Sequence, residues 1–330
     1  MKKMLSAILS LAMVFTMCTT AFAAEEQAAD GTFDGYQEIV QSSFSQRSAT
    51  PATLSNSNDK VIIHNNGNLM ISDYFAEGKN DGNSLVAVTY IPVDGKIIET
   101  AHFTSGGSMS EAQLSDIVAD YESELSLSEL PSVSPMSTIK HYQWTFPANG
   151  KTMASLTTAV TCDRKSSNST VDGVACSVWD VTTFSQLEKV DAMRLNNQYT
   201  RLSVDQPNEH LIAYGPSEST SGGDITVGLD GAGVPSFSYT FNIDGFSVEN
   251  LSSMSGEYGR WAFIDNFGNE PEFTTKPGIR ATNSHGDFVV ELSHTVDATV
   301  NVAQSINQST GVIQIWVNDQ IGRASCRERV

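Results

Sequence analysis

Basic residues are scarce in this sequence. Its 330 residues include 19 Lys and Arg against 38 Asp and Glu, which gives a formal net charge of −19 at pH 7. Proteins that bind nucleic acids or anionic headgroups do so through clusters of Lys and Arg, and the chain has none before its last ten residues. The composition therefore excludes nucleic acid as a partner and favours a soluble protein with some attraction for cations.

Long apolar runs are also lacking, since no stretch reaches the 18 or so residues of a transmembrane helix. The longest run, residues 5 to 17, follows Lys2 and Lys3 and precedes Ala21-Phe22-Ala23. A short apolar core between a basic start and small residues is typical of a secretory signal peptide of bacterial style. We expect residues 1–23 to be removed near Ala23, so that the protein is secreted to the extracellular space or the cell surface without a transmembrane helix.

Cysteine is rare, with four in the whole chain. Cys18 belongs to the predicted signal peptide, and Cys326 belongs to IGRASCRERV, which we interpret as a non-native basic tail at 320–330. The two that remain, Cys162 and Cys176, predict one disulfide in an exported protein. A hairpin centred on Ser169 would place them opposite each other.

A competing hairpin register exists in the same stretch. The dipeptide Asp172-Gly173 is a strong signal for a two-residue turn. With that turn at the tip, Cys176 lies opposite Ser169 and the cysteines stay unpaired. We favour the disulfide register because it aligns the apolar positions of the two strands.

Helical periodicity is confined to one segment. Residues 24–57 read as a flexible polar linker. Residues 58–135 predict a small α+β region, with hairpins around Asn65–Asn68 and Asp94-Gly95 and a helix over 110–130. Residues 136–319 alternate apolar and polar positions between turn residues, as in 288–302. The predicted fold is therefore mainly β, with an N-terminal α+β region before an antiparallel β-sandwich-like or open-barrel domain.

Catalytic motifs are missing as well. The scattered histidines give no HExxH spacing, and residues 106–110, GGSMS, lack the last glycine of a nucleophile elbow and fit a helix cap better. We therefore predict no catalytic residues and no cofactor, and we expect a protein that is not an enzyme. His294 interrupts the apolar phase of 288–302, and we interpret it as a hydrogen-bonded structural residue.

Two loops carry candidate ligand-binding groups. The segment DNFGNEPE offers Asp265, Asn269, Glu270 and Glu272 as hard oxygen ligands for calcium, although the spacing differs from an EF-hand and a solvated turn explains it equally. The segment YGRWAF offers Tyr258, Arg260 and Trp261 for stacking on a ligand, with strand packing as the alternative.

The last candidate feature is an amphipathic hairpin over residues 222–243, GGDITVGLDGAGVPSFSYTFNI. Its composition is similar to that of the membrane-inserting strands of secreted β-pore-forming toxins, while an ordinary sandwich hairpin explains it as well. The sequence thus predicts a non-catalytic binding protein for an unknown extracellular ligand or surface component. The alternatives are a secreted pore-forming or membrane-damaging protein and, after it, a secreted hydrolase.

Overall fold

The structure is a computed structural model, and it describes residues 37–38, 61–64, 74–93, 96–105, 137–148, 151–189, 194–265, 272–301 and 304–317. Everything described is strand, turn or irregular chain, which confirms the predicted mainly β fold. The predicted signal peptide, the helix over 110–130 and the tail at 320–330 lie outside these ranges, as does most of the predicted linker. Within the described ranges there is no helix with the length and apolarity needed to cross a membrane.

Contacts divide the chain into two compact units that interleave along the sequence. Unit 1 comprises residues 1–70, 85–102 and 108–133, and unit 2 comprises residues 71–84, 103–107 and 134–330. The strands of unit 1 are β1 (Gln37–Glu38) and β2 (Val61–His64), with most of β3 (Asn83–Val93) and β4 (Lys96–Ser105). β1 pairs with β2 in parallel, and β2 pairs with β3 in antiparallel fashion.

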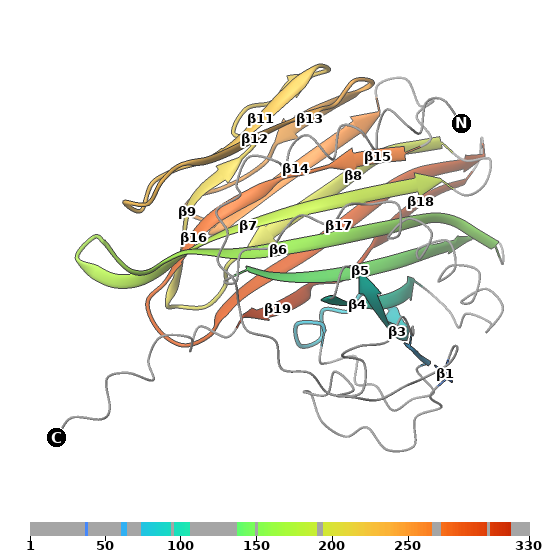
Figure 1. Ribbon diagram of the computed structural model, residues 1–330. Coiled ribbons are helices and arrows are strands. Elements are labelled where there is room, and N and C mark those ends of the chain that lie inside the picture. The colour runs from blue at the N-terminus through green and yellow to red at the C-terminus, as the bar shows by residue number, and fades with distance from the viewer. Residues whose placement is uncertain are drawn as a thin grey trace. The chain divides into compact units, whose positions relative to one another are not determined.

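Unit 2 contains two large antiparallel sheets. The part of sheet A in unit 2 has the order β5-β6-β7-β16-β9, with β15 also paired to β7 (Figure 1). Sheet B has the order β10-β13-β14-β8-β17-β18, with β19 also paired to β17. The strands of sheet A are β5 (Ser137–Ala148), β6 (Lys151–Val171), β7 (Val174–Lys189), β9 (Glu209–Gly215), β15 (Glu272–Thr275) and β16 (Gly278–Asn283). The strands of sheet B are β8 (Arg194–Ser203), β10 (Thr220–Ser221), β13 (Phe246–Asn250), β14 (Tyr258–Asp265), β17 (Phe288–Asn301), β18 (Gln304–Ser309) and β19 (Ile313–Val317).

The core of unit 2 lies between these sheets, because each strand turns alternate residues inward. On β17 the predicted apolar phase is buried from Phe288 to Ala298, while Ser293 and Thr295 face outward. His294 lies in the buried phase, where its ring hydrogen-bonds the hydroxyls of Thr158 on sheet A (3.1 Å) and Thr200 on sheet B (3.1 Å). It therefore joins the two sheets, and its burial lowers its pKa to about 3.

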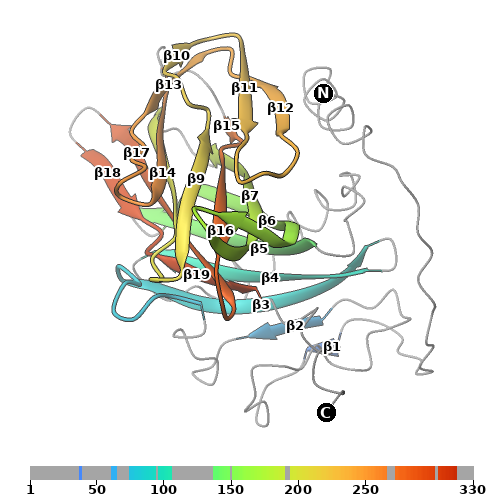
Figure 2. The same ribbon diagram turned by 90° about the vertical axis from the view of Figure 1, so that its left-hand side faces the viewer.

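A separate two-stranded sheet covers part of the outer face of sheet A. Its strands, β11 (Asp224–Leu229) and β12 (Phe237–Asn242), pair only with each other among the described strands, and Figure 2 shows them beside β9. Ile225, Val227 and Leu229 are buried and the residues between them are exposed. The predicted amphipathic hairpin is thus confirmed as a hairpin that packs its apolar face onto the sandwich.

The hairpin of β6 and β7 turns at Asp172 and Gly173, whose φ angles of 51° and 81° lie in the left-handed region that such a turn requires. Its tip projects beyond the neighbouring strands (Figure 1). Cys162 lies opposite Val181, and Cys176 lies opposite Ser169. The predicted disulfide is therefore wrong for this structure.

The two cysteines are separated by five positions along β7, because Val181 follows Cys176 by five residues. At about 3.3 Å per residue this is roughly 16 Å, beyond the 7 Å or so that a disulfide can span between Cα atoms. Both thiols are free and buried. Burial raises the pKa of Cys162 to about 12 and also raises that of Cys176, which favours the protonated thiol in both.

Candidate functional site

The three predicted stacking residues lie on β14 but on opposite faces of it. Trp261 points into the core, where it is fully buried and donates its Nε1–H to the carbonyl of Pro216 at 2.8 Å. It cannot stack on a ligand, so this part of the prediction is wrong, and the packing alternative holds for it. Tyr258 and Arg260 point to the outer face of sheet B, because neighbouring positions of a strand alternate.

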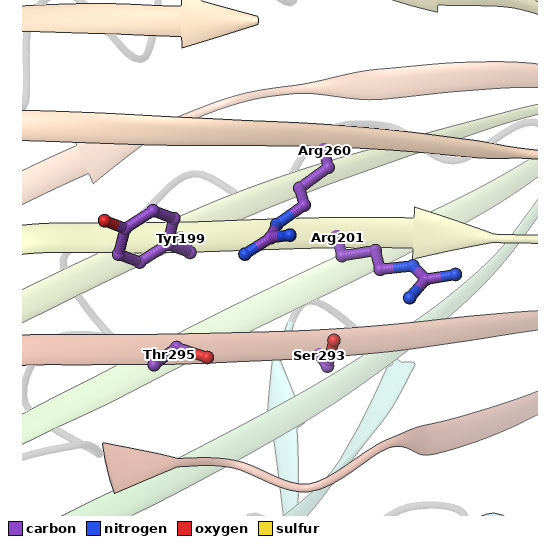
Figure 3. Close-up of a pocket in the computed structure, with 5 residues that line it drawn as sticks. All are labelled: Tyr199, Arg201, Arg260, Ser293 and Thr295. Carbon is purple, nitrogen blue, oxygen red and sulfur yellow. The ribbon is translucent and has the colours of Figure 1, made fainter. Parts of the chain in front are cut away.

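On that outer face Arg260 meets a second arginine. Arg260 lies directly opposite Arg201 of β8 in the antiparallel register. The guanidinium carbon of Arg201 lies 4.5 Å from the ring centre of Tyr258, and that of Arg260 lies 5.6 Å from the ring centre of Tyr199. Each arginine therefore stacks on the tyrosine of the other strand, and the two side chains extend in opposite directions (Figure 3).

This arrangement offsets an unfavourable pairing. Like charges directly opposite each other destabilise a sheet, and a tyrosine ring face stabilises a guanidinium by about 0.5–1 kcal/mol at an exposed site. Both arginines are exposed. We call Tyr199, Arg201, Tyr258 and Arg260 the arginine–tyrosine cluster.

A shallow pocket of about 210 Å³ opens between these side chains. Strand β17 completes it with Ser293, which lies opposite Arg201, and Thr295, which lies opposite Tyr199. The side chains drawn in Figure 3 come from three adjacent strands, so their backbone positions are fixed by the sheet. The pocket offers guanidinium donors and two hydroxyls on a rigid surface.

The electrostatics of the pocket contrast with those of the chain. The net charge is −19, yet neither Arg201 nor Arg260 forms an ion pair with any acidic side chain in the described ranges. The acidic residue that follows on the same face of β17, Asp297, accepts hydrogen bonds from Asn197 and Asn307 instead. The pocket is therefore a local positive site that has the chemistry to attract an oxyanion.

The calcium candidates are only partly described. Asp265 ends β14 and is buried, and Glu272 begins β15, where a hydrogen bond of 3.5 Å from Gln186 reaches its carboxylate. Asn269 and Glu270 lie outside the described residues, so calcium binding stays a prediction. Within the described part of the chain, no three His, Cys, Asp or Glu side chains gather closely enough to hold a metal ion.

Sequence reasoning missed Tyr199, Arg201, Ser293 and Thr295. The available signal was alternation: all four occupy the polar phase of their strands, and arginine is rare in this chain. Their assembly depends on strand pairing between segments about 60 and 90 residues apart, which one sequence does not specify.

Comparisons with known proteins add little to this geometry. No family model and no curated protein matches the chain. Among solved structures, one titled "Pore forming protein" is 8% identical, with a TM-score of 0.34 over 56% of this chain and 93% of that chain. Clostridium perfringens delta-toxin is 9% identical, with a TM-score of 0.34 over 73% of this chain and 99% of that chain. The membrane-inserted form of the Clostridium perfringens NetB toxin is 8% identical, with a TM-score of 0.24 over 55% of this chain and 93% of that chain. Similarity at this level assigns the chain to no family and carries no conclusion about its activity.

Proposed function

We propose that this protein is an exported, non-catalytic binding protein whose ligand carries an oxyanion, such as a carboxylate, and that the arginine–tyrosine cluster is its binding site. The observation that carries the proposal is the pair of directly opposed arginines on the outer face of sheet B, without an acidic partner among the described residues. Stacking on the tyrosine rings offsets the unfavourable pairing of the two arginines but gives neither guanidinium a hydrogen-bond acceptor. A bound oxyanion would supply one, because a guanidinium can donate two parallel hydrogen bonds to it.

The net charge of the whole chain further limits the class of ligand that we expect. A net charge of −19 repels polyanions such as nucleic acid or a heavily sulfated polysaccharide at long range. A single oxyanion on an otherwise neutral molecule experiences little of this repulsion and still gains the local hydrogen bonds. Ser293 and Thr295 can hydrogen-bond neighbouring hydroxyls, and the tyrosine rings can contact an apolar ring face. An acidic sugar on a neutral glycan fits this combination.

The test is calorimetric titration of the purified protein with N-acetylneuraminate, glucuronate and inorganic phosphate at low ionic strength. We expect saturable binding of at least one acidic sugar. Arg201→Gln and Arg260→Gln should each weaken it by about tenfold or more, since a hydrogen bond to a charged group contributes about 1.5–3 kcal/mol.

Arg194→Gln is the matched control, because Arg194 is exposed on the same strand β8 but does not line the pocket. It should leave the affinity unchanged. Absence of saturable binding to all three probes, or an equal loss in the Arg194 variant, would contradict the proposal.

A second candidate function is membrane damage, and the β11–β12 hairpin is the observation that favours it. The hairpin is amphipathic, pairs with no other described strand, and is flanked by Gly222, Gly223 and Gly245, all with positive φ. Glycines in this conformation are compatible with a hairpin that changes its orientation. Each strand has six residues, fewer than the nine to eleven or so of a membrane-spanning strand, so insertion would require flanking residues to become strand.

Dye release from liposomes, combined with electron microscopy for ring-shaped oligomers, tests this second function directly. Release with rings would establish it. A protein that stays monomeric and releases no dye would end it without affecting the oxyanion proposal, whose readout is calorimetric.

A further inference from the structure

A second pocket lies beside the β11–β12 hairpin, is lined by residues from both faces of it, and shares no residue with the arginine–tyrosine cluster. It is an open groove of about 600 Å³ between this hairpin, strand β9 and the loops that follow β9 and β13. The groove is larger than the first pocket, and its walls come from three segments of unit 2. Its size is suitable for a small organic ligand.

Three glycines lie near the groove, and the structural requirement for glycine differs among them. A Cβ on Gly215 would lie 2.8 Å from a side-chain carbon of Val227, so the close packing of the hairpin on β9 requires it. Gly231 has a φ of 93°, which side chains rarely adopt. Gly228 has neither reason: its φ is not positive, and a Cβ built on it meets nothing within 4 Å.

Gly228 nevertheless lies in the interior of β11, opposite Ser238, and lines the groove. Glycine in a strand interior is destabilising by roughly 0.5–1 kcal/mol relative to alanine. Such a glycine commonly marks a place where a ligand or another backbone approaches closely. The backbone of Gly228 packs near Gly215 of β9, but a Cβ built on Gly228 would meet nothing within 4 Å, so the space on that side of the strand is available to a ligand.

The groups around Gly228 define the chemistry of that ligand. Tyr214 and Phe237 are half-buried lining residues, and Met254 is 43% exposed at the rim. Phe237 lies opposite Leu229, on the other face of the hairpin from Gly228, and Lys165 Nζ lies 4.8 Å from its ring centre. Hydroxyl groups and one carboxylate complete the lining, from Ser217, Thr226, Asp230, Ser236 and Ser238. None of the described residues lining the groove is basic.

We propose that this groove binds a neutral saccharide. Sugar rings have apolar C–H faces that pack against aromatic rings, and their hydroxyls donate to carboxylates and exchange hydrogen bonds with serine and threonine. The Asp230 carboxylate disfavours anionic ligands, so the specificity is opposite to that of the arginine–tyrosine cluster. Backbone exposed at Gly228 lets the sugar lie flat against the strand. This inference does not depend on the proposed function of the first pocket.

The test is saturation-transfer NMR, followed by titration, with galactose, glucose, mannose and N-acetylglucosamine. We expect at least one of them to bind saturably. Gly228→Val should weaken that binding by about tenfold or more, because its side chain occupies the space that the sugar needs. Asp230→Asn should weaken it by about fivefold to tenfold, since a hydrogen bond to a charged group is lost.

Gly228→Val should fold, because the space around the added Cβ is open and valine favours strands. Gly228→Ala is the smaller second variant if it does not, and it should fold at least as stably as the natural protein while still weakening binding. Ser305→Val, at an exposed position of β18 away from the groove, is the matched control and should bind normally.

Three outcomes would overturn the inference: no saturable binding of any of the four sugars, unchanged binding in both Gly228 variants, or equal weakening by Ser305→Val. Arg201→Gln should leave sugar binding intact. A result that contradicts the saccharide proposal is thereby distinguished from one that contradicts the oxyanion proposal.

Discussion

The buried ion pair of Arg280 and Asp180 gives the sharpest stability prediction. These residues lie opposite each other on β16 and β7, with 0% and 2% of their side chains exposed. Arg280 donates from Nε and Nη2 to the two carboxylate oxygens at 2.7 and 2.9 Å. It also donates to the carbonyls of Gly231 and Pro235, at 3.2 and 3.0 Å, in the loop that joins β11 to β12. One guanidinium thus connects sheet A with the hairpin that covers it.

Arg280→Met removes the charge and all four hydrogen bonds while keeping an unbranched apolar side chain. Asp180 is then left buried, with Lys165 3.9 Å away as its remaining ion-pair partner among the described residues. Removing one partner of a buried pair costs about 3–5 kcal/mol, because the other charge is left uncompensated. Since Lys165 compensates in part, we expect about 3 kcal/mol, which raises the unfolding equilibrium constant roughly a hundredfold.

The assay is urea unfolding at neutral pH, followed by tryptophan fluorescence. The double variant Asp180→Leu with Arg280→Met should cost less than Arg280→Met alone, because it leaves no unpaired carboxylate. Arg260→Met, at the exposed arginine of β14, is the control and should change the free energy of unfolding by no more than about 0.5 kcal/mol. A loss below about 1 kcal/mol in Arg280→Met, or a double variant as costly as the two single variants together, would refute the reasoning.

Three other expected outcomes concern buried titratable groups. Burial raises the pKa of Glu209 from 4.5 to about 7, so the stability that its protonated form contributes is present below about pH 4.5 and is lost as the pH rises through 7. Glu209→Gln should remove this loss, at most about 3 kcal/mol, from the difference between urea unfolding at about pH 5 and about pH 8. The lowered pKa of His294 acts in the opposite direction: the stability contributed by its neutral ring is present above about pH 6.5 and is lost as the pH falls toward 3. His294→Leu should therefore flatten the acid limb of the stability curve while lowering stability at neutral pH, and an unchanged acid limb would contradict this. Cys162 and Cys176 should resist a thiol reagent in the native protein and both react after unfolding without reductant, whereas a bridge between them in mass spectrometry would contradict the strand register.

Much of the fold could be predicted because alternation is a local property. The inward phase of β17 from Phe288 to Ala298, and the strands β3 and β4 on either side of Asp94-Gly95, are confirmed. The hairpin register around the cysteines could also have been predicted, since Asp172-Gly173 is the turn that forms. The prediction preferred the other register because the strand before this turn, RKSSNSTV, has almost nothing to bury.

The polar strand before Asp172-Gly173 does not exclude this register, for a physical reason. Strand β5 pairs with β6 only as far as Asp163, and β16 pairs with β7 only from Ser177 onward. The tip beyond them is a two-stranded ribbon, exposed over much of its surface, with no further described strand paired to it. A projecting ribbon needs no apolar face, so polar residues are appropriate there.

The candidate sites were less accessible to sequence reasoning. Alternation alone could have separated Trp261 from Arg260, because neighbouring residues of one strand cannot share a face. Alternation could not have brought Arg201 to Arg260, since that contact depends on which strands are neighbours in sheet B. The groove also depends on which segments lie side by side in the fold. In the sequence Gly228 is one of several glycines in a segment rich in turn residues, and it becomes unusual only when the space around it is known.

The two pockets together make a binding function more specific than either does alone. One presents guanidinium groups on the outer face of sheet B, and the other is lined by a carboxylate, hydroxyls and the half-buried residues Tyr214 and Phe237. They share no residue, and their electrostatic preferences are opposite, so a small ligand suited to one is disfavoured by the other. A glycan that carries both acidic and neutral sugars contains groups suited to each. The arginines of sheet B have no acidic partner among the described residues, and Gly228 of β11 has open space where a side chain would lie; contact with such a molecule would account for both.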